Sequence, residues 1–274
     1  MATAETAVII GSGSIGLAIG RIAGIGRSVL LADYNEETMN AAATQLRGEG
    51  YEVTTHPVDI SNQPAVAALA DKAAALGEVT RVIIAAGVSP VQATAERVLH
   101  VDLLGTAYVL EEFGRVITAG GSGIVIASMA GHMGEGYPRE IEHALAYTPT
   151  AELLDLPFLA TDKVGNSGAA YTLAKRANAL RVQAAATTWG ARGARINSLS
   201  PGIISTPLAQ DEMSGPFAEG YRNMINTSAA GRMGTPAEVG AIAGFLLGPE
   251  GAFVTGSDLL MDGGVIAAMR AGQL

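Results

Sequence analysis

The sequence predicts an α/β protein built on one doubly wound, mostly parallel sheet, and two patterns indicate this fold. Short apolar runs alternate with longer amphipathic stretches along the 274 residues, which is typical of parallel strands covered by helices on both faces. The first apolar run leads directly into a glycine-rich turn, as it does where such a sheet begins. No shift in composition and no internal repeat divides the chain, so we interpret residues 1–274 as a single domain.

Seven apolar runs are expected to form strands, because each is short and bounded by residues that favour turns. These runs are 6–10, 28–32, 51–55, 81–86, 123–128, 194–199 and 258–261. Between them, apolar residues recur with the period of an amphipathic helix. The expected helices span 15–25, 36–48, 63–76, 94–118, 169–189 and 236–247. Right-handed crossovers between successive strands then produce the doubly wound arrangement.

Two connections are longer than a compact α/β domain normally needs. The insertion at residues 132–168 predicts a lid, a binding loop or a subunit interface, and it is too apolar for a flexible linker. Residues 205–235 are expected to form a substrate loop with one or two short helices. Apolar residues within 145–160 and 205–225 suggest that both segments contact a medium-sized apolar substrate.

The composition excludes several classes of partner and site. A net charge of −9 and a pI near 4.9 argue against nucleic acid and against an anionic membrane surface as partners. The absence of cysteine excludes disulfides, thiolate metal sites and cysteine nucleophiles. The four histidines are scattered, so no metal site is expected. We find neither a signal peptide nor a long apolar run, so we expect a cytoplasmic protein.

A Gly-x-Gly-x-x-Gly pattern follows the first expected strand and opens the first expected helix. With an acidic residue at the end of the next strand, it forms the fingerprint of a Rossmann-type dinucleotide-binding unit. Gly11 allows the tight turn, Gly13 lets the backbone approach a pyrophosphate, and Gly16 permits close helix packing. The helix N-terminus favours the anion. The residues of this turn predicted to bind the cofactor are Gly11, Ser12, Gly13, Ser14, Ile15 and Gly16.

Asp33 ends the second expected strand and favours NAD over NADP as the cofactor. Its carboxylate can accept hydrogen bonds from both ribose hydroxyls and would repel a 2′-phosphate, and the neighbouring Tyr34 supplies no positive charge. The alternative is that Asp33 only caps the next helix. Asp59, followed by Ile60, ends the third expected strand and could reach the adenine edge, with a helix cap again as the alternative.

Tyr171 and Lys175 stand four residues apart and therefore share one side of a helix. The chain has only three lysines among its 17 basic residues, so a lysine at this spacing suggests a specific need for one. An ammonium group beside a phenol stabilises the phenolate and lowers its pKa from about 10, which makes tyrosine usable as an acid or base. The compact ammonium could also hold ribose hydroxyls, for which the planar fork of arginine is no simple substitute.

The motifs of the chain resemble, in order and over nearly its whole length, those of the short-chain dehydrogenase/reductase family. They are the glycine turn, "AAG" at 85–87, "IASMAG" at 126–131, "YTLAK" at 171–175, "SPGIISTPL" at 200–208 and "LLMDGG" at 259–264. The resemblance implies that Tyr171 is the acid/base, that Lys175 assists it, and that Ser128 donates to the substrate carbonyl. It also implies cofactor contacts from Tyr171, Lys175, Ala85, Ala86, Gly87, Pro201, Gly202, Ile204 and Thr206.

Three features depart from the pattern of this family. The glycine turn is one residue shorter than usual and resembles a variant that still binds the cofactor. Asp102 stands where the family has an asparagine that positions a proton-relay water. Either the carboxylate holds that water, or the relay is absent and Asp102 only pairs locally. The stretch from Ser128 to Tyr171 is unusually long and resembles an insertion in bacterial hydroxysteroid dehydrogenase/carbonyl reductases that lies near the substrate and changes subunit assembly.

The expected function is hydride transfer between NAD(H) and a medium-sized apolar secondary alcohol or ketone, for example one that is steroid- or terpenoid-like. An NADPH-dependent 3-oxoacyl reductase and a non-catalytic dinucleotide-binding sensor are the alternatives. The resemblance also implies a homodimer or a homotetramer.

Overall fold

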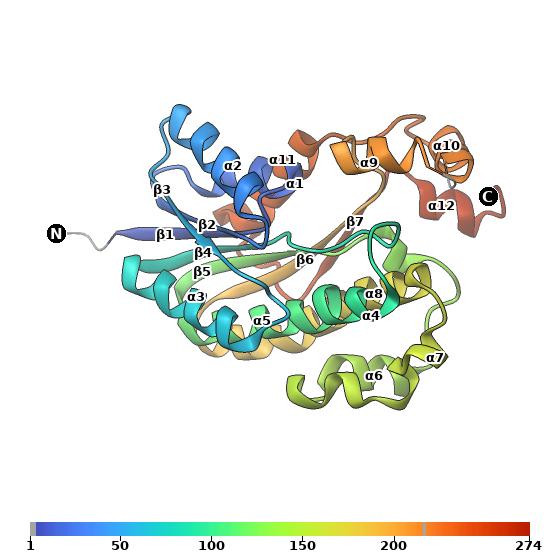
Figure 1. Cartoon of the computed structure of the whole chain (residues 1–274), viewed down its shortest axis with the longest axis horizontal. Coiled ribbons are helices and arrows are strands. Elements are labelled where there is room, and N and C mark those ends of the chain that lie inside the picture. The colour runs from blue at the N-terminus through green and yellow to red at the C-terminus, as the bar shows by residue number, and fades with distance from the viewer. Residues whose placement is uncertain (1–3, 216–217) are drawn as a thin grey trace.

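The computed structural model describes residues 4–215 and 218–274. Its centre is a seven-stranded parallel sheet in the order β3-β2-β1-β4-β5-β6-β7. This order confirms the predicted doubly wound fold, because the chain winds from β1 to β3 in one direction and from β4 to β7 in the other (Figure 1). The strands are β1 (Glu5–Ile10), β2 (Ser28–Asp33), β3 (Val53–Pro57), β4 (Glu78–Ile84), β5 (Ile117–Ile126), β6 (Arg195–Pro201) and β7 (Asp258–Met261).

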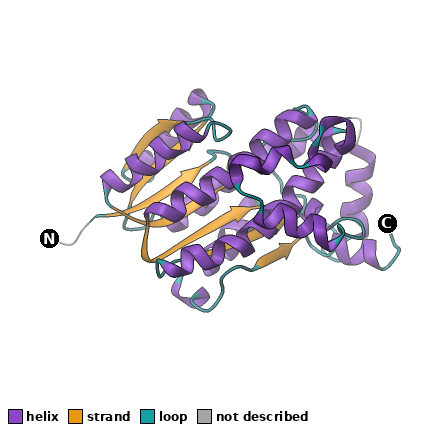
Figure 2. Cartoon of the chain, turned by 90° about the horizontal axis from the view of Figure 1, so that it is seen from below, coloured by secondary structure: helices purple, strands orange, loops and turns teal. Residues whose placement is uncertain are grey.

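Helices cover both faces of the sheet, as Figures 1 and 2 show. One face carries α1 (Ser14–Ala23), α2 (Glu36–Gly48) and α11 (Pro236–Leu247), and the other carries α3 (Gln63–Leu76), α5 (Thr106–Val116) and α8 (Ser167–Ala191). Successive side chains of a strand point to opposite faces. Accordingly Val8 and Ile9, both fully buried, belong to different hydrophobic clusters. The strands can therefore be apolar throughout, which is the pattern that the sequence shows.

The helix predicted over 94–118 is wrong at its end and in its middle. A short helix α4 (Ala95–Val98) passes into a π-helical stretch, Leu99–Gly105, before α5 begins. Strand β5 then starts at Ile117, inside the range predicted as helix. The β-branched Ile117 pairs with Val79 of β4, so partners in the sheet override the helical pattern there.

The insertion forms an ordered layer outside α8 (Figure 1). It contains α6 (Arg139–Tyr147), two 3-10 turns and α7 (Thr161–Val164). Leu145 and Leu153 are fully buried in a cluster with residues of α8 and of the π-helical stretch. The insertion is thus packed onto the helices by its own apolar residues.

The 205–235 segment contains two short helices, α9 (Pro207–Glu212) and α10 (Ala218–Thr227), as the sequence predicts. They lie with α12 (Val265–Arg270) beyond the ends of β6 and β7 (Figure 1). Across the part of the chain that the structure describes, no helix combines the length and the apolar character needed to span a membrane.

Candidate active site

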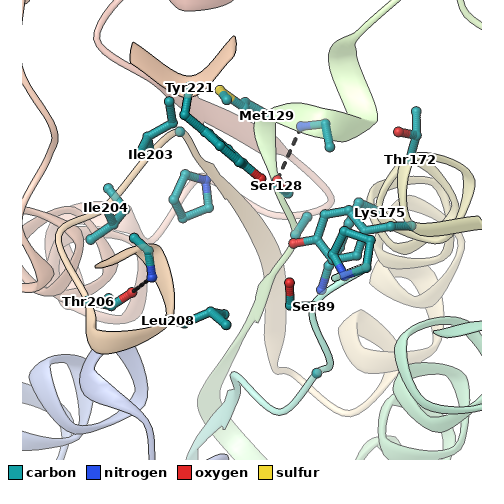
Figure 3. A pocket seen from close by; sticks show the side chains of 18 of the residues that line it. Ser89, Ser128, Met129, Thr172, Lys175, Ile203, Ile204, Thr206, Leu208 and Tyr221 are labelled. Atoms are coloured by element: carbon teal, nitrogen blue, oxygen red, sulfur yellow. Dashed lines mark hydrogen bonds between the residues drawn. The ribbon is translucent and has the colours of Figure 1, made fainter. Parts of the chain in front are cut away.

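A cavity of about 790 Å³ opens at the carboxyl ends of β4, β5 and β6. This is the edge at which open α/β sheets bind their ligands. Figure 3 shows its walls: Ser89 follows β4, Ser128 follows β5, Ile204 follows β6, Lys175 comes from α8 and Tyr221 comes from α10. Segments far apart in the sequence therefore meet here because parallel strands end at the same edge.

The glycine turn has the geometry that a bound pyrophosphate needs. Gly11 has a φ of +104°, and a Cβ on it would overlap the backbone of Ala85 and Ala86. A Cβ on Gly16 would strike the carbonyl oxygen of Gly11, whereas a Cβ on Gly13 would meet nothing within 4 Å. No side chain caps the N-terminus of α1. Its backbone N–H groups thus face open space in which an anion can lie.

The Asp33 carboxylate is hydrogen-bonded to the glycine turn. Its Oδ2 accepts hydrogen bonds from the Ser12 backbone N–H at 2.6 Å and from the Ser12 hydroxyl at 2.7 Å. Its Oδ1 accepts from the backbone N–H of Asn35. The cap of α2 is Asn35, which accepts from Thr38, so the alternative that Asp33 serves as the cap is wrong. Tyr34 is largely exposed.

Asp59 holds a small polar cluster at the end of β3. It accepts two hydrogen bonds from Ser61 and one from Arg97, at 3.2 Å. Burial raises the pKa of Asp59, but these hydrogen bonds and the charge of Arg97 bring it below its ordinary value. Asn62 caps α3, so the cap alternative for Asp59 is also wrong. Ile60 is buried and packs against Gly105.

Ser128, Tyr171 and Lys175 line the same cavity. Ser128 directly follows the last residues of β5, and its Oγ accepts a hydrogen bond from the backbone N–H of Ala130. The turn after it packs so closely on α8 that a Cβ on Gly131 would overlap the backbone of Lys175 and Arg176. This packing brings the serine to the helix that carries the tyrosine and the lysine.

The Lys175 ammonium lies against the Tyr171 ring. Its Nζ is 5.2 Å from the ring centroid, a cation–π distance, and the side chain is buried. Asn166 caps α8 by accepting from the N–H of Ala169, so the helix starts one turn before Tyr171. The predicted pair therefore faces the cavity from the second and third turns of α8.

Asp102 lies behind this pair on the π-helical stretch. It is fully buried, and its Oδ1 is 3.4 Å from Lys175 Nζ. The second partner of the carboxylate is the backbone N–H of Val88. Asp102 thus contacts the lysine directly.

The loop after β6 closes the other side of the cavity. Pro201, Gly202, Ile204 and Thr206 all line it. A Cβ on Gly202 would overlap Asp262, and Ile204 bridges to Gly234. The Thr206 hydroxyl accepts from the N–H of Ala209 in α9. These contacts fix the loop where the sequence predicts contacts with the cofactor.

Comparison with known proteins identifies the family. Residues 5–138 match the short chain dehydrogenase model, and residues 139–266 match a model described as enoyl-(acyl carrier protein) reductase. The short-chain dehydrogenase/reductase bsc3 of Alternaria brassicicola is 41% identical over 264 residues, covering 96% of each chain. The chain belongs to the short-chain dehydrogenase/reductase family. It is also 27% identical to the 3-alpha-hydroxysteroid dehydrogenase/carbonyl reductase of Comamonas testosteroni, over 70% of this chain and 74% of that one.

A solved structure supports the same fold. A short-chain type dehydrogenase/reductase from Mycobacterium ulcerans superposes with a TM-score of 0.75 at 25% identity, covering 96% of this chain and 90% of that one. As a member of the short-chain dehydrogenase/reductase family, this chain is an oxidoreductase that acts on alcohols or ketones with a nicotinamide dinucleotide cofactor. The open space at Gly13 and the uncapped N-terminus of α1 fit such a cofactor.

Several residues of this dehydrogenase/reductase site have no sequence signal of their own. Ser89 lies two residues after the "AAG" motif, and Tyr221 is placed by the fold of α10 alone. Figure 3 shows the Tyr221 side chain directed toward Ser128. The further lining residues that the sequence reasoning missed include Met129, Met133, Thr172 and Ile203. Leu208 and Met224 also line the cavity, in agreement with the expectation for the apolar residues of 205–225.

The expectation that residues 145–160 contact the substrate is wrong for this cavity. Among the described residues, those lining it include none from 134–167. The apolar residues of that stretch instead pack on α8, since Leu145 and Leu153 share a cluster with Leu173 and Leu180.

Proposed function

We propose that this protein transfers hydride between NAD(H) and a medium-sized apolar secondary alcohol or its ketone. The observation that carries the proposal is the meeting of Ser128, Tyr171 and Lys175 in one cavity beside the glycine turn. The bound nicotinamide would accept or donate the hydride. The glycine turn, Asp33 and the loop after β6 would hold the dinucleotide so that its reactive ring lies in the cavity.

Three side chains of this protein have separate roles in the proton transfer and in binding. Tyr171 takes the hydroxyl proton during oxidation and returns it during reduction. Lys175, 5.2 Å from the ring centroid, stabilises the phenolate and holds ribose hydroxyls. Ser128 donates a hydrogen bond to the substrate oxygen. Because these groups are preorganised by α8 and β5, the substrate oxygen is oriented as it binds.

The walls of the cavity favour an apolar substrate. Ile126, Met129, Ile203, Leu208 and Met224 line it, and methionines let a wall adapt to an irregular hydrocarbon shape. Its volume of about 790 Å³ lies within the usual range for small-molecule sites. A cyclic, steroid- or terpenoid-like alcohol fits these walls better than a sugar alcohol, which would bury some of its hydroxyls against apolar side chains.

We also propose a homodimer or homotetramer and a cytoplasmic location. Phe253 is fully exposed in the loop that leads to edge strand β7, and Phe245 is exposed on α11, so these aromatic residues support a subunit contact on this part of the molecule. The absence of cysteine agrees with a reducing compartment.

The direct test is the reduction of NAD⁺ by the purified protein with a panel of secondary alcohols. We expect turnover with apolar cyclic alcohols and little with polyols, measured as NADH absorbance. Efficient use of NADPH and 3-oxoacyl thioesters in their place would favour the 3-oxoacyl reductase. Binding of dinucleotide without turnover of any alcohol or ketone would favour the sensor and contradict the proposal.

A further inference from the structure

The buried pair formed by Asp102 and Lys175 sets the charge of the candidate site. Asp102 is 0% exposed and Lys175 is 6% exposed, and their charged atoms are 3.4 Å apart. Lys175 Nζ also reaches the carbonyl oxygen of Ile126 at 3.5 Å. A buried ion pair at this spacing is screened little by solvent, so each charge acts strongly on its neighbours.

The carboxylate is held in place from two further sides. The N–H of Val88 donates to Oδ1 at 3.2 Å and lies 3.4 Å from Oδ2. A Cβ on Gly87 would overlap Oδ1, so the backbone after β4 passes directly against it. Asp102 comes from the π-helical stretch Leu99–Gly105, a rare local structure that is frequent at functional sites. The carboxylate therefore cannot swing away from the lysine without moving backbone.

The charges acting on the pair come from the site itself. Lys175 of α8 is the charged side chain that acts on Asp102, and Asp102 and Tyr171 are those that act on Lys175. Burial raises the pKa of Asp102, and the lysine charge offsets part of this effect. Burial lowers the pKa of Lys175, but the Asp102 carboxylate and, once ionised, the Tyr171 phenolate raise it by more. The ammonium therefore stays charged at neutral pH.

We propose that Asp102 is a positioning residue that fixes Lys175 and offsets its charge, so that Tyr171 ionises at higher pH than it would beside an unpaired lysine. This inference rests on the proposed function for its kinetic consequence. The ammonium favours the Tyr171 phenolate, and a carboxylate on the far side of the ammonium opposes that effect. At an effective dielectric constant of about 20, a unit charge roughly 12 Å away moves an ionisation by about one pH unit, and a closer charge moves it further.

The test is the Asp102→Asn variant, which keeps the shape of the side chain and an acceptor for the Val88 N–H. We expect the acidic limb of the pH profile of kcat/KM for alcohol oxidation to move down by about one pH unit. Asp102→Ser is also neutral, so we expect it to move the acidic limb in the same direction. This variant replaces Asp102→Asn in the test if the asparagine variant does not fold.

The matched control is Glu142→Gln. It removes a carboxylate from Arg176, the residue of α8 next to Lys175, where the two side chains are bonded at 2.7 Å. Because Glu142 lies in the insertion, away from the cavity, this variant should leave the pH profile unchanged.

A second readout needs neither cofactor nor substrate. The absorbance of the phenolate is titrated in wild type and in Asp102→Asn, each corrected with the matching Tyr171→Phe protein. Ionisation of Tyr171 at lower pH in the variant supports the proposal. A folded variant whose kinetic limb and phenol titration stay in place, or move upward, overturns it. Failure of wild type to oxidise any alcohol contradicts the proposed function instead, and the titration still decides the role of Asp102.

Discussion

Asp33 shows how one side chain can serve both the fold and the choice of cofactor. Its Oδ2 holds the glycine turn through Ser12, at 2.6 and 2.7 Å. The remaining acceptor sites of its carboxylate can face the adenosine ribose. The same negative charge that can receive ribose hydroxyls would repel a 2′-phosphate.

We expect wild type to bind NAD⁺ at least about tenfold more tightly than NADP⁺, a difference of about 1.4 kcal/mol. Asp33→Asn should reduce the preference for NAD⁺ over NADP⁺, because it removes the repulsion between the carboxylate and the 2′-phosphate while it keeps an acceptor for Ser12. Calorimetric titration with both dinucleotides measures the two affinities, with the exposed Asp71→Asn as control. Tighter binding of NADP⁺ by wild type would overturn our reading of Asp33.

The sequence predicts residues whose role depends on local spacing, and it misses those placed by distant segments. Gly11 and Gly16 could be recognised from a pattern six residues long, and both positions indeed have no room for a side chain. Tyr171 and Lys175 are recognised from their helical spacing together with their place after the fifth expected strand and among the ordered family motifs. Tyr221, in contrast, reaches the cavity because α10 folds over the ends of the strands, and no local pattern encodes that approach.

At the scale of elements, the expected long helix after β4 proved to be α4, a π-helical stretch and α5. The π-helical residues are mostly apolar and compatible with an α-helix, so their sequence contains no signal for the wider turn. The wider turn contains Asp102, whose contact with Lys175 is tertiary and therefore leaves no local pattern in the sequence. The end of the same helix was misplaced because the strand-forming Ile117 pairs with a residue far back in the chain.

The partly buried Arg181 helps to hold the insertion against α8. The guanidinium of Arg181 donates to the carbonyls of Leu145 and Thr148 at 3.1 Å and to the Thr150 hydroxyl at 3.0 Å. Burial lowers the pKa of Arg181, in agreement with a desolvated group that depends on these acceptors.

We predict that Arg181→Ala lowers the free energy of unfolding by about 2–4 kcal/mol, because three partly buried acceptors lose their donor. Turnover per folded molecule should be kept, since the segment it holds does not line the cavity. Urea unfolding measures the loss. The control is Arg115→Ala, whose exposed ion pairs should contribute less than about 1 kcal/mol. Equal losses in the two variants would contradict this account of the insertion.

At the scale of the whole molecule, the alternation of strands and helices was enough to predict the sheet and its winding. The position of the insertion was not predictable, because an apolar segment can cover a cavity, a helix or another subunit equally well. Here α6 covers α8. The exposed Phe245 and Phe253 are therefore better candidates for a subunit contact than the insertion.

Phe253→Asp tests that contact. Phe253 is fully exposed, and a charge at this position would have to be buried in a subunit interface without a partner. We expect light scattering to report a smaller assembly for the variant than for wild type, while Phe158→Leu, a change within the packed insertion, keeps the wild-type mass. An unchanged mass for Phe253→Asp would place the interface elsewhere.

Steady-state kinetics of Tyr171→Phe with NAD⁺ and the best alcohol show whether Tyr171 is the acid/base of an alcohol dehydrogenase. Phenylalanine keeps the ring beside Lys175 and removes only the hydroxyl, so kcat should fall by about 10²–10⁴-fold in a folded protein. Tyr147→Phe, at an exposed position of α6, should keep wild-type kcat. A Tyr171→Phe protein as active as wild type would contradict the account.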